Sequence, residues 1–563
     1  MPGTKELMIN FTEYHNKLIF IPLGGCNEIG INMSVYIYKS MAVIVDCGAG
    51  FPDETIPGAE VVVADISFLK HIKSNIIGMI ITHIHQDHLG AVQFLWPEIE
   101  CPIYTTNFTA TLLKLKLNEY NLSKKVQIIT VTAGQRIHLG PFEIEMAPLT
   151  HSTPEMQALM IRTEAGNVLH TGDWKFDHDP VVGRPGDEEL LKRFGDEGIT
   201  ALVCDSTNVF NQQKSGSEGE VRKSLIDLVA GCPKLVVVAT FASNIARLDT
   251  LLFAAKQSGR KVILAGRSLL NLFAAAQENG YLLDYTNVVK ENEFKGFKRE
   301  ELMVIATGCQ GEPMAAITKM VDKLHNSIEL NHSDTVIFSS KIIPGNEKRI
   351  FRLFNILIKE GVEVITERDH FVHVSGHPSV EELKHMYDLV RPQIVIPVHG
   401  EAIHLHEHCK IARSHGIKHS LEISNGCVAL VDKNAPKVIG HVQNGYQVID
   451  GNNMISANSK IFKTRRLMHV EGIAIITVFI GKGRLLSRPV VNLPGIIDRE
   501  ENFEGYTNLI KIITDEFKND NNSLASLSYK DIEQKVRGVV KRYLNEETGK
   551  IPRIFVNVER VNY

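Results

Sequence analysis

Three histidines and an aspartate stand within six consecutive positions, directly after an apolar run. The run, residues 76–81, is typical of a buried strand, so His83, His85, Asp87 and His88 begin where that strand ends. Imidazole nitrogens and carboxylate oxygens are ligands of zinc and similar divalent ions. In an extended or turning loop, His83 and His85 point to one side, while Asp87 and His88 reach a second point. One short loop can therefore serve two adjacent metal ions.

Further candidate ligands stand at the ends of other apolar runs, each beside a glycine or another small residue. They are His151 after residues 142–146, Asp173 after residues 168–169, and His399 after residues 394–398. A single histidine at a strand end is more often an ordinary polar residue. Several such sites along one chain favour their convergence on one centre.

The ordered set of motifs resembles the metallo-β-lactamase-fold nucleases of the β-CASP group, and most closely the bacterial ribonuclease J family. The cluster at residues 83–88 matches the metal motif His-x-His-x-Asp-His. The later motifs match at His151, Asp173, Asp205, His373-Val-Ser375-Gly-His377 and His399, and the first family motif matches at Asp46. Similar phrases occur at residues 22–30, 239–244 and 338–346, and the resemblance runs from about residue 17 to the end of the chain.

The resemblance implies a role for each matching residue. A first ion would be held by His83, His85 and His151, a second by Asp87, His88 and His399, and Asp173 would bridge them. Asp46 would orient a ligand histidine without touching a metal ion. We expect two divalent ions, zinc best and manganese as the alternative. Such ions activate water and offset the charge of a phosphodiester, so Asp87 also counts as catalytic.

Phosphodiester hydrolysis also needs a proton for the leaving 3′-oxygen. His377, paired with Asp205, is the candidate. His377 precedes a predicted helix start with Ser379 and Glu382 as a capping box. Helix N-termini favour phosphate, so His373, Ser375 and His377 are expected to bind a phosphate group of the substrate. The alternative is a turn whose histidines only satisfy backbone groups.

By resemblance, Phe241, Ser243 and Asn244 line the nucleotide pocket, with Phe241 stacking on a base. The alternative for Phe241 is a buried side chain in an apolar cluster. The family usually has Gly and Glu where this chain has Ile84 and Gln86. Neither position supplies a ligand, so metal binding should survive the difference.

The histidine pair His404 and His408 also has metal-ligand spacing on a helix face. It lacks the H-E-x-x-H pattern, so we interpret it as a solvated or packing face. The segment Asp177-His178-Asp179 is similarly interpreted as a polar loop without ligands.

Composition favours a large cytoplasmic enzyme. No apolar stretch reaches the roughly 20 residues of a membrane span, and the N-terminus lacks a signal-peptide pattern. The eight cysteines include no C-x-x-C pair, so we expect reduced thiols. With a net charge of −4, RNA binding would need basic charge concentrated in a channel.

The fold class predicted is α/β: a metallo-β-lactamase αββα sandwich, interrupted by a β-CASP α/β insert and followed by a small C-terminal α/β domain. Strand–helix alternation between residues 235 and 359 implies a parallel sheet in the insert. The predicted domains are 1–217 and 372–447 for the sandwich, 218–371 for the insert, 448–465 for a linker and 466–563 for the C-terminal domain.

The function expected is that of a metal-dependent ribonuclease with 5′-to-3′ exonuclease activity, preferring 5′-monophosphate ends, and endonuclease activity, in RNA maturation and mRNA decay. Expected partners are RNA, further copies of the chain in a homodimer or homotetramer through the C-terminal domain, and other RNA-decay proteins, with no membrane. The alternatives are a DNA-directed β-CASP nuclease, another hydrolase of the same fold such as a lactamase or thioesterase, and a non-catalytic RNA-binding scaffold.

Overall fold

Two β-sheets face each other across a shared apolar core in the computed structural model, which describes residues 11–52, 55–481, 484–518 and 527–561. The order of the first sheet is β23-β22-β1-β2-β3-β6-β7-β8 and that of the second is β21-β20-β13-β12-β11-β10-β9. The first comprises β1 (Ile19–Gly24), β2 (Met33–Tyr38), β3 (Met41–Val45), β6 (Ile76–Ile80), β7 (Ile103–Thr105), β8 (Ile128–Thr130), β22 (Cys427–Leu430) and β23 (Lys437–His441). The second comprises β9 (Arg136–Leu139), β10 (Phe142–Pro148), β11 (Gln157–Thr163), β12 (Gly166–His170), β13 (Ala201–Asp205), β20 (Ile394–Val398) and β21 (His419–Ser420).

Helices pack against the second sheet and connect strands of the first. A second apolar cluster joins the second sheet to three helices: α5 (Glu188–Glu197), α11 (Val380–Val390) and α12 (Ala402–Ser414). The helices between strands of the first sheet are α1 (Ser67–His71), α2 (Gln86–Leu89), α3 (Val92–Ile99) and α4 (Asn107–Glu119), and the short strands β4 (Ala49–Gly50) and β5 (Val61–Ala64) precede α1. The two-sheet sandwich expected from the sequence is confirmed.

Between β13 and α11 the chain forms an inserted α/β body with its own core. All strands of its six-stranded sheet are parallel, in the order β16-β15-β17-β14-β18-β19, as predicted. Its elements are α6 (Glu218–Gly231), β14 (Val236–Ala239), α7 (Ile245–Gln257), β15 (Lys261–Ala265), α8 (Arg267–Glu278), β16 (Val288–Val289), β17 (Leu302–Ala306), α9 (Ala316–Val321), β18 (Thr335–Phe338), α10 (Glu347–Lys359) and β19 (Glu363–Ile365).

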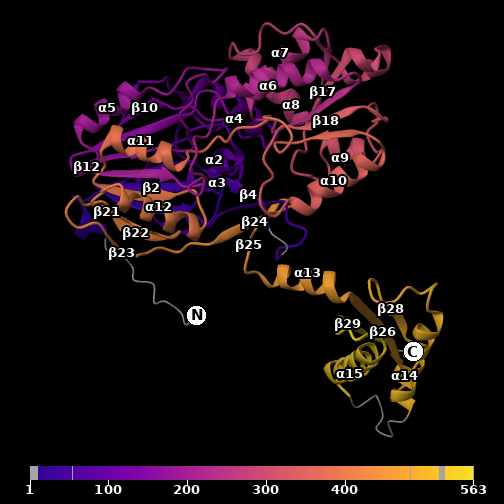
Figure 1. The fold of residues 1–563 in the computed structure, drawn as a ribbon. Helices are drawn as coiled ribbons and strands as arrows, with labels where there is room; N and C mark the ends of the chain where they lie inside the picture. Colours follow the sequence, from indigo (N-terminus) through magenta and orange to yellow (C-terminus); the bar gives the residue numbers. More distant parts are fainter. Residues whose placement is uncertain (1–10, 53–54, 482–483, 519–526, 562–563) are drawn as a thin grey trace. The chain divides into compact units, whose positions relative to one another are not determined.

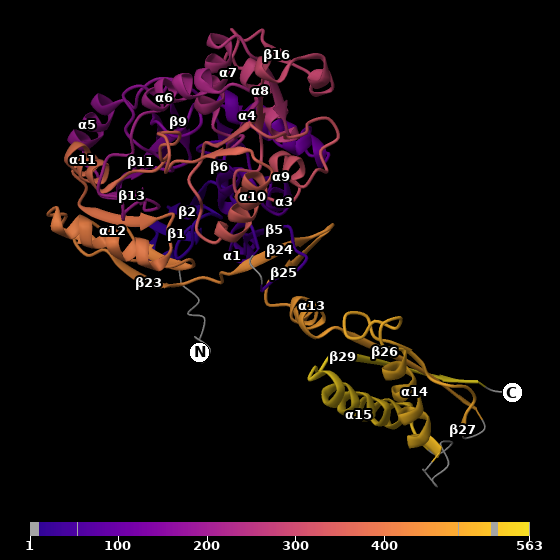
Figure 2. The same cartoon turned by 45° about the vertical axis from the view of Figure 1, so that its right-hand side comes forward.

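After the insert, the chain returns to both sheets of the sandwich. β20 pairs in parallel with β13, and β22 pairs with β1, so segments about 190 and 410 residues apart in sequence lie side by side. Figures 1 and 2 show these returning strands in orange next to the violet and indigo strands of the first part. The return places His399, which follows β20, at the same sheet end as Asp205.

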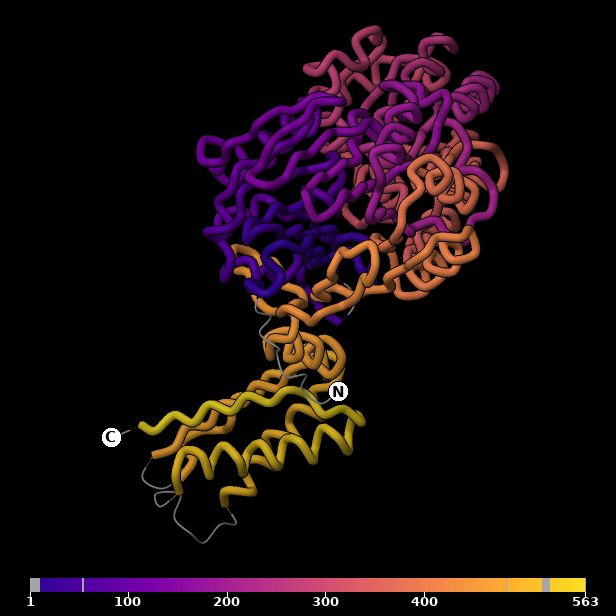
Figure 3. Tube along the Cα trace, turned by 90° about the vertical axis from the view of Figure 1, so that its left-hand side faces the viewer, coloured from indigo at the N-terminus to yellow at the C-terminus, as the bar shows by residue number. Residues whose placement is uncertain are grey.

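The remaining residues, 51–62 and 446–563, form a second unit. Its two longest strands, β26 (Ile473–Gly481) and β29 (Arg553–Arg560), pair in parallel along their length (Figure 3). Residues 448–465 contain the end of β24 (Tyr446–Asp450), all of β25 (Asn453–Ser456) and the start of α13 (Lys460–Glu471). The other elements are β27 (Arg484–Leu485), β28 (Val490–Asn492), α14 (Phe503–Lys518) and α15 (Tyr529–Thr548).

Three expectations from composition concern the whole chain. All eight cysteines are described, and each is a buried free thiol, as expected. Among the described residues, no helix combines the length and apolar character needed to cross a bilayer. The expectation that the chain has no signal peptide rests on residues 1–6, and these lie outside the described residues.

Candidate metal centre

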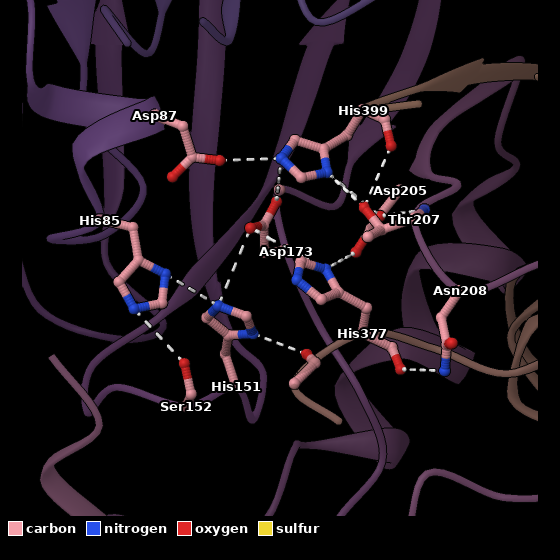
Figure 4. Close-up of polar contacts among 12 residues, drawn as sticks. His85, Asp87, His151, Ser152, Asp173, Asp205, Thr207, Asn208, His377 and His399 are labelled. Atoms are coloured by element: carbon pink, nitrogen blue, oxygen red, sulfur yellow. Dashed lines mark hydrogen bonds and ion pairs between the residues drawn. The ribbon is translucent and has the colours of Figure 1, made fainter. Parts of the chain in front are cut away.

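The first group of candidate ligands is built around the loop between β6 and α2. His83 and His85 come from this loop, and His151 comes from the turn after β10. Their ring nitrogens and a carboxylate oxygen of Asp173 lie within 4.8 Å of one another. Figure 4 shows His85, His151 and Asp173 pointing toward one another from different segments.

Hydrogen bonds on the opposite ring nitrogens fix the tautomers of two of these histidines. His151 Nδ1 lies 2.6 Å from the carbonyl of Gly376, which can only accept, so Nδ1 carries the proton. Thr82 donates its hydroxyl to Asp46, so its oxygen accepts from His83 Nδ1 at 3.0 Å. His83 Nε2 and His151 Nε2 are therefore unprotonated.

Both of these bare nitrogens face the same atom of a third histidine. His85 Nδ1 lies 3.1 Å from His83 Nε2 and 3.0 Å from His151 Nε2. Burial holds the pKa values of His83 and His151 well below their usual range and lowers that of His85 to about 4. Neutral imidazoles with converging lone pairs form a donor set that fits a divalent cation.

A second group of candidate ligands shares Asp173 with the first. It contains Asp87, His88, Asp173 and His399, again with one ligand atom of each within 4.8 Å of the others. His399 Nε2 lies 2.9 Å from Asp87 Oδ2, and His88 Nε2 lies 3.1 Å from Asp173 Oδ1. Burial alone would raise the pKa of Asp173, but the imidazoles of His399 and His88 hold it well below its usual range. Two carboxylates and two imidazoles fit a second divalent ion beside the first.

Asp46 organises the loop from behind the candidate ligands. Its carboxylate accepts from His88 Nδ1 at 2.7 Å and from the backbone N–H of Thr82 at 2.8 Å. His88 therefore turns Nε2 toward the other candidate ligands, and this atom lies 3.0 Å from Asn32 Nδ2. A carboxylate that orients a ligand histidine in this way also makes it more basic.

Asp46 and His399 share an uncommon backbone conformation. Both follow directly after a strand and have a positive φ, 63° and 54° respectively. For a non-glycine residue this conformation costs roughly 1–2 kcal/mol. At His399 it is accompanied by a hydrogen bond of 2.6 Å from the backbone N–H to the carbonyl of Gly25. Strain of this kind concentrates at functional sites because the surrounding structure must hold one geometry.

His377 and Asp205 lie next to both groups, and with Asp173 and His399 they form a third set of potential ligand atoms within 4.8 Å of one another. His377 Nδ1 is 2.7 Å from Asp205 Oδ2, and the His377 and His399 rings stack with centroids 5.5 Å apart (Figure 4). Burial opposes protonation of His377, but the Asp205 carboxylate raises its pKa above the ordinary value. The pair therefore keeps a proton next to the candidate metal centre.

Comparison with known proteins identifies the family. The chain is 36% identical over 555 residues to "Ribonuclease J" of Sinorhizobium meliloti, covering 97% of this chain and 98% of that protein. It is 34% identical over 551 residues to "Ribonuclease J" of Mycobacterium tuberculosis, covering 96% of each chain. This chain belongs to the ribonuclease J family.

Family models match successive parts of the chain, in the order expected for ribonuclease J. They are the beta-lactamase superfamily domain over residues 42–202, the ribonuclease J beta-CASP domain over 233–357, the Zn-dependent metallo-hydrolase RNA specificity domain over 361–421 and the ribonuclease J C-terminal domain over 460–561. The predicted fold class is confirmed. Together with the buried His/Asp groups, these matches make the chain a metal-dependent hydrolase that acts as a ribonuclease.

A solved structure supports the fold alone. The crystal structure of a protein of unknown function from Enterococcus faecalis V583 superposes with a TM-score of 0.51 at 17% identity. It covers 74% of this chain and 100% of that chain.

Two residues of this ribonuclease J site were missed in the sequence. The hydroxyl of Thr207 contacts His399 Nδ1, and the Asn208 amide donates to the His377 carbonyl at 3.4 Å (Figure 4). Their signal was position, since both follow Asp205 directly after β13. The sequence cannot reveal which residues after a strand end turn back toward the site.

The segment 373–377 lies beside the same site. The hydroxyl of Ser375 accepts from the backbone N–H of His377 at 3.1 Å. His373 Nδ1 is buried and has no hydrogen-bond partner among the described residues. Burial, followed by the positive charge of Arg247 and Lys175, holds the pKa of His373 well below its usual range.

The three residues predicted for the nucleotide pocket follow β14. Phe241 is partly buried and packs against the core of the insert. Asn244 caps α7 through the backbone N–H of Arg247, and its amide donates to Glu218 at 3.2 Å. Ser243 lies between them, half-buried.

His408 and Gln86, both singled out in the sequence, lie outside the ligand groups found among the described residues. His408 is fully buried and lies 2.8 Å from the Ser206 hydroxyl. Gln86, at the family's glutamate position, accepts a hydrogen bond from Lys116 at 2.6 Å. Burial lowers the pKa of Lys116 to about 8.

Proposed function

We propose that this ribonuclease degrades RNA from the 5′ end, preferring 5′-monophosphate ends, and also cleaves RNA internally. The observation that carries the proposal is the set of ligand groups sharing Asp173, in which the two built from the loop after β6 lie against the His377–Asp205 pair. Two-ion sites of this kind act on phosphodiesters because in-line displacement needs charge stabilisation on both attacking and leaving oxygens.

We assign the ligands by their grouping. The first ion would be held by His83, His85 and His151, the second by Asp87, His88 and His399, with Asp173 between them. Zinc suits this histidine-rich set best, and manganese is the alternative. When bound, the ions supply an activated water and offset phosphate charge. Asp46 would orient His88 through Nδ1, which leaves Nε2 to face the second ion.

We assign His377 as the proton donor to the leaving 3′-oxygen. Its Nδ1 is held by Asp205, so Nε2 is the atom left to deliver a proton. The negative charge of Asp205 favours the protonated imidazole before the bond breaks. The stacked ring of His399 brings this donor next to the proposed second ion.

We assign His373, Ser375 and His377 to a phosphate subsite that accounts for the preference for 5′-monophosphate ends. The buried Nδ1 of His373, which has no hydrogen-bond partner among the described residues, supports a ligand there. A bulkier 5′-triphosphate would not fit the same space. Phe241, Ser243 and Asn244 would contact the adjoining nucleotide.

The domain boundaries and assembly also belong to this proposal. We place the sandwich at 1–217 and 372–447, the insert at 218–371, a linker at 448–465 and the C-terminal domain at 466–563. The C-terminal domain would join copies of the chain as a homodimer or homotetramer, which sedimentation of the full chain tests. We expect the protein to act in the cytoplasm with other RNA-decay proteins.

The proposal is tested with one internally labelled RNA carrying either a 5′-monophosphate or a 5′-triphosphate, incubated with purified protein and Zn²⁺ or Mn²⁺. We expect mononucleotides, released faster from the monophosphate RNA, together with a smaller set of internal fragments. The double variant Asp87→Ala His88→Ala should release neither. A matched DNA strand is included in parallel.

Each alternative has its own result in this assay. Internal fragments alone, indifferent to the 5′ end, would overturn the exonuclease part. Cleavage of the DNA but not of the RNA would make the chain a DNA-directed nuclease. No cleavage of either strand with metal bound would leave a non-catalytic RNA-binding protein or a hydrolase of another ester.

A further inference from the structure

An exposed aromatic side chain stands in the short loop that follows Asp205. Phe210 is 51% exposed, whereas its neighbour Val209 is 1% exposed and packs in the core beneath the second sheet. The buried side chain of Val209 anchors the loop, and the ring of the next residue, Phe210, faces solvent. A single exposed apolar ring is ordinary on a protein surface, so what distinguishes Phe210 is where its ring is held.

The loop that carries Phe210 is fixed to the site by hydrogen bonds. Val209 N donates to the Ser206 carbonyl at 3.3 Å, and Asn211 N donates to the Asn208 carbonyl at 3.0 Å. The Asn208 amide reaches the His377 carbonyl. Five positions separate Phe210 from Asp205, a span of at most about 18 Å even if fully extended, and these turns shorten it. The ring is therefore held within a few nucleotides' reach of the proposed ions.

A histidine on α12 supports the ring from one side. The Phe210 and His404 rings meet edge to face, with centroids 5.2 Å apart and an interplanar angle of 62°. His404 lies directly against Gly400, because a Cβ on that glycine would stand 2.8 Å from His404 Cβ. Gly400 follows His399, so the supporting histidine is tied to the same loop as the ligand.

We propose that Phe210, supported by His404, stacks on a nucleobase of the RNA strand next to the scissile phosphate. The inference rests on the proposed function and adds a base-binding contact on the sandwich, separate from the insert. An exposed phenylalanine ring offers a π-face to any of the four bases and no hydrogen bond to choose among them. This contact strengthens binding without imposing a sequence preference.

The position of the ring favours a nucleobase over burial against a protein. The same short loop carries Thr207, which contacts His399, and Asn208, which contacts His377. An RNA whose phosphate reaches these histidines comes close to this loop, so a base is the apolar surface that we expect at Phe210. Phe241, in contrast, already packs against the core of the insert.

The test compares the wild-type chain with Phe210→Ala and Phe210→Tyr. The substrates are short 5′-monophosphate RNAs, intact or with single abasic positions near the 5′ end. Phe351→Ala is the control, since Phe351 is an exposed phenylalanine on α10 that also contacts a neighbouring ring, Phe354. Binding is measured by fluorescence anisotropy with the metal present, and cleavage by KM and kcat.

We expect Phe210→Ala to raise Kd and KM for intact RNA by about 5- to 150-fold, the range that corresponds to stacking of one base. Phe210→Tyr and Phe351→Ala should stay near wild type. One abasic position should remove the difference between wild type and Phe210→Ala. Hydrolysis of bis(4-nitrophenyl) phosphate, which has no base, should be equal in all variants.

Other results would overturn the inference. Equal Kd and KM of Phe210→Ala and wild type on intact RNA would exclude stacking, and an equal loss on every abasic RNA would make the effect structural. If wild type binds RNA through Phe210 but cleaves none, the proposed function fails and the stacking contact stands. If wild type binds no RNA, both fail.

Discussion

At the residue scale, a proton on His377 is the feature that separates this site from a bare metal-binding cluster. Asp205 holds Nδ1 and raises the pKa of the imidazole, while three other histidines nearby are kept neutral by burial. We predict that His377→Ala lowers kcat on RNA by about 10²- to 10⁴-fold, the usual contribution of a general acid. Bound metal, measured by inductively coupled plasma mass spectrometry, should stay at the wild-type amount.

His385→Ala is the control, because His385 is a surface histidine on the helix that follows His377. It should behave like wild type in both measurements. Full turnover by His377→Ala with normal metal content would remove this residue from the mechanism.

At the element scale, the start of α11 is fixed by a buried carboxylate. Glu382 closes the capping box with Ser379 and also accepts from the backbone N–H groups of Phe176 and Ser215, at 3.0 and 3.2 Å. Glu382→Ala leaves these buried donors without a partner, so we predict a loss of about 1–3 kcal/mol in the free energy of unfolding. Urea denaturation followed by circular dichroism measures this loss.

Glu381→Ala provides the comparison for this prediction, since Glu381 is exposed in the same helical turn. A change within about 0.5 kcal/mol is expected there. An equally small change for Glu382→Ala would show that water replaces the lost carboxylate.

At the scale of the whole molecule, one buried arginine joins the insert to the segment that returns to the sandwich. Arg247 on α7 is 0% exposed, pairs with Glu218 on α6 at 3.0 Å, and donates to the carbonyl of Val372 at 2.8 Å. Val372 directly precedes the segment 373–377. We predict that Arg247→Met costs about 3–5 kcal/mol, because Glu218 remains as an unpaired buried charge. Chemical denaturation measures the loss.

The same variant should also slow RNA cleavage, because the Val372 carbonyl at the start of segment 373–377 keeps only one of its two donors, the Ser339 hydroxyl. Lys256→Met is the control, as Lys256 is exposed near the end of the same helix. Wild-type stability of Arg247→Met would mean that Glu218 finds another partner or is hydrated.

The sequence predicts most of the elements and the residues that come together at the candidate centre. Runs of apolar residues predict the strands, and the candidate ligands stand where these runs end. Both features can be predicted because each depends only on neighbouring residues. The helix start at Ser379 is predicted for the same reason, since a capping box involves residues only three positions apart.

Other features depend on contacts between distant segments. Asp177, interpreted in the sequence as part of a polar loop without ligands, is buried, pairs with Lys175 at 2.8 Å and accepts from the N–H of Glu218. The sequence places Thr207 and Phe210 after a strand end, but it does not reveal that Thr207 turns toward His399 and Phe210 toward solvent.

Local patterns of polarity thus determined by themselves which residue types stand at the strand ends. Only the tertiary structure decided the tautomer of a candidate ligand such as His151. Its Nδ1 donates to the carbonyl of Gly376, which is 225 residues away in the sequence. The tertiary structure also decided which loop residues face the site. The physical reason is that hydrogen bonds and burial at this site are made by β13, β20 and the loop after β6, which meet only when the chain returns from the insert.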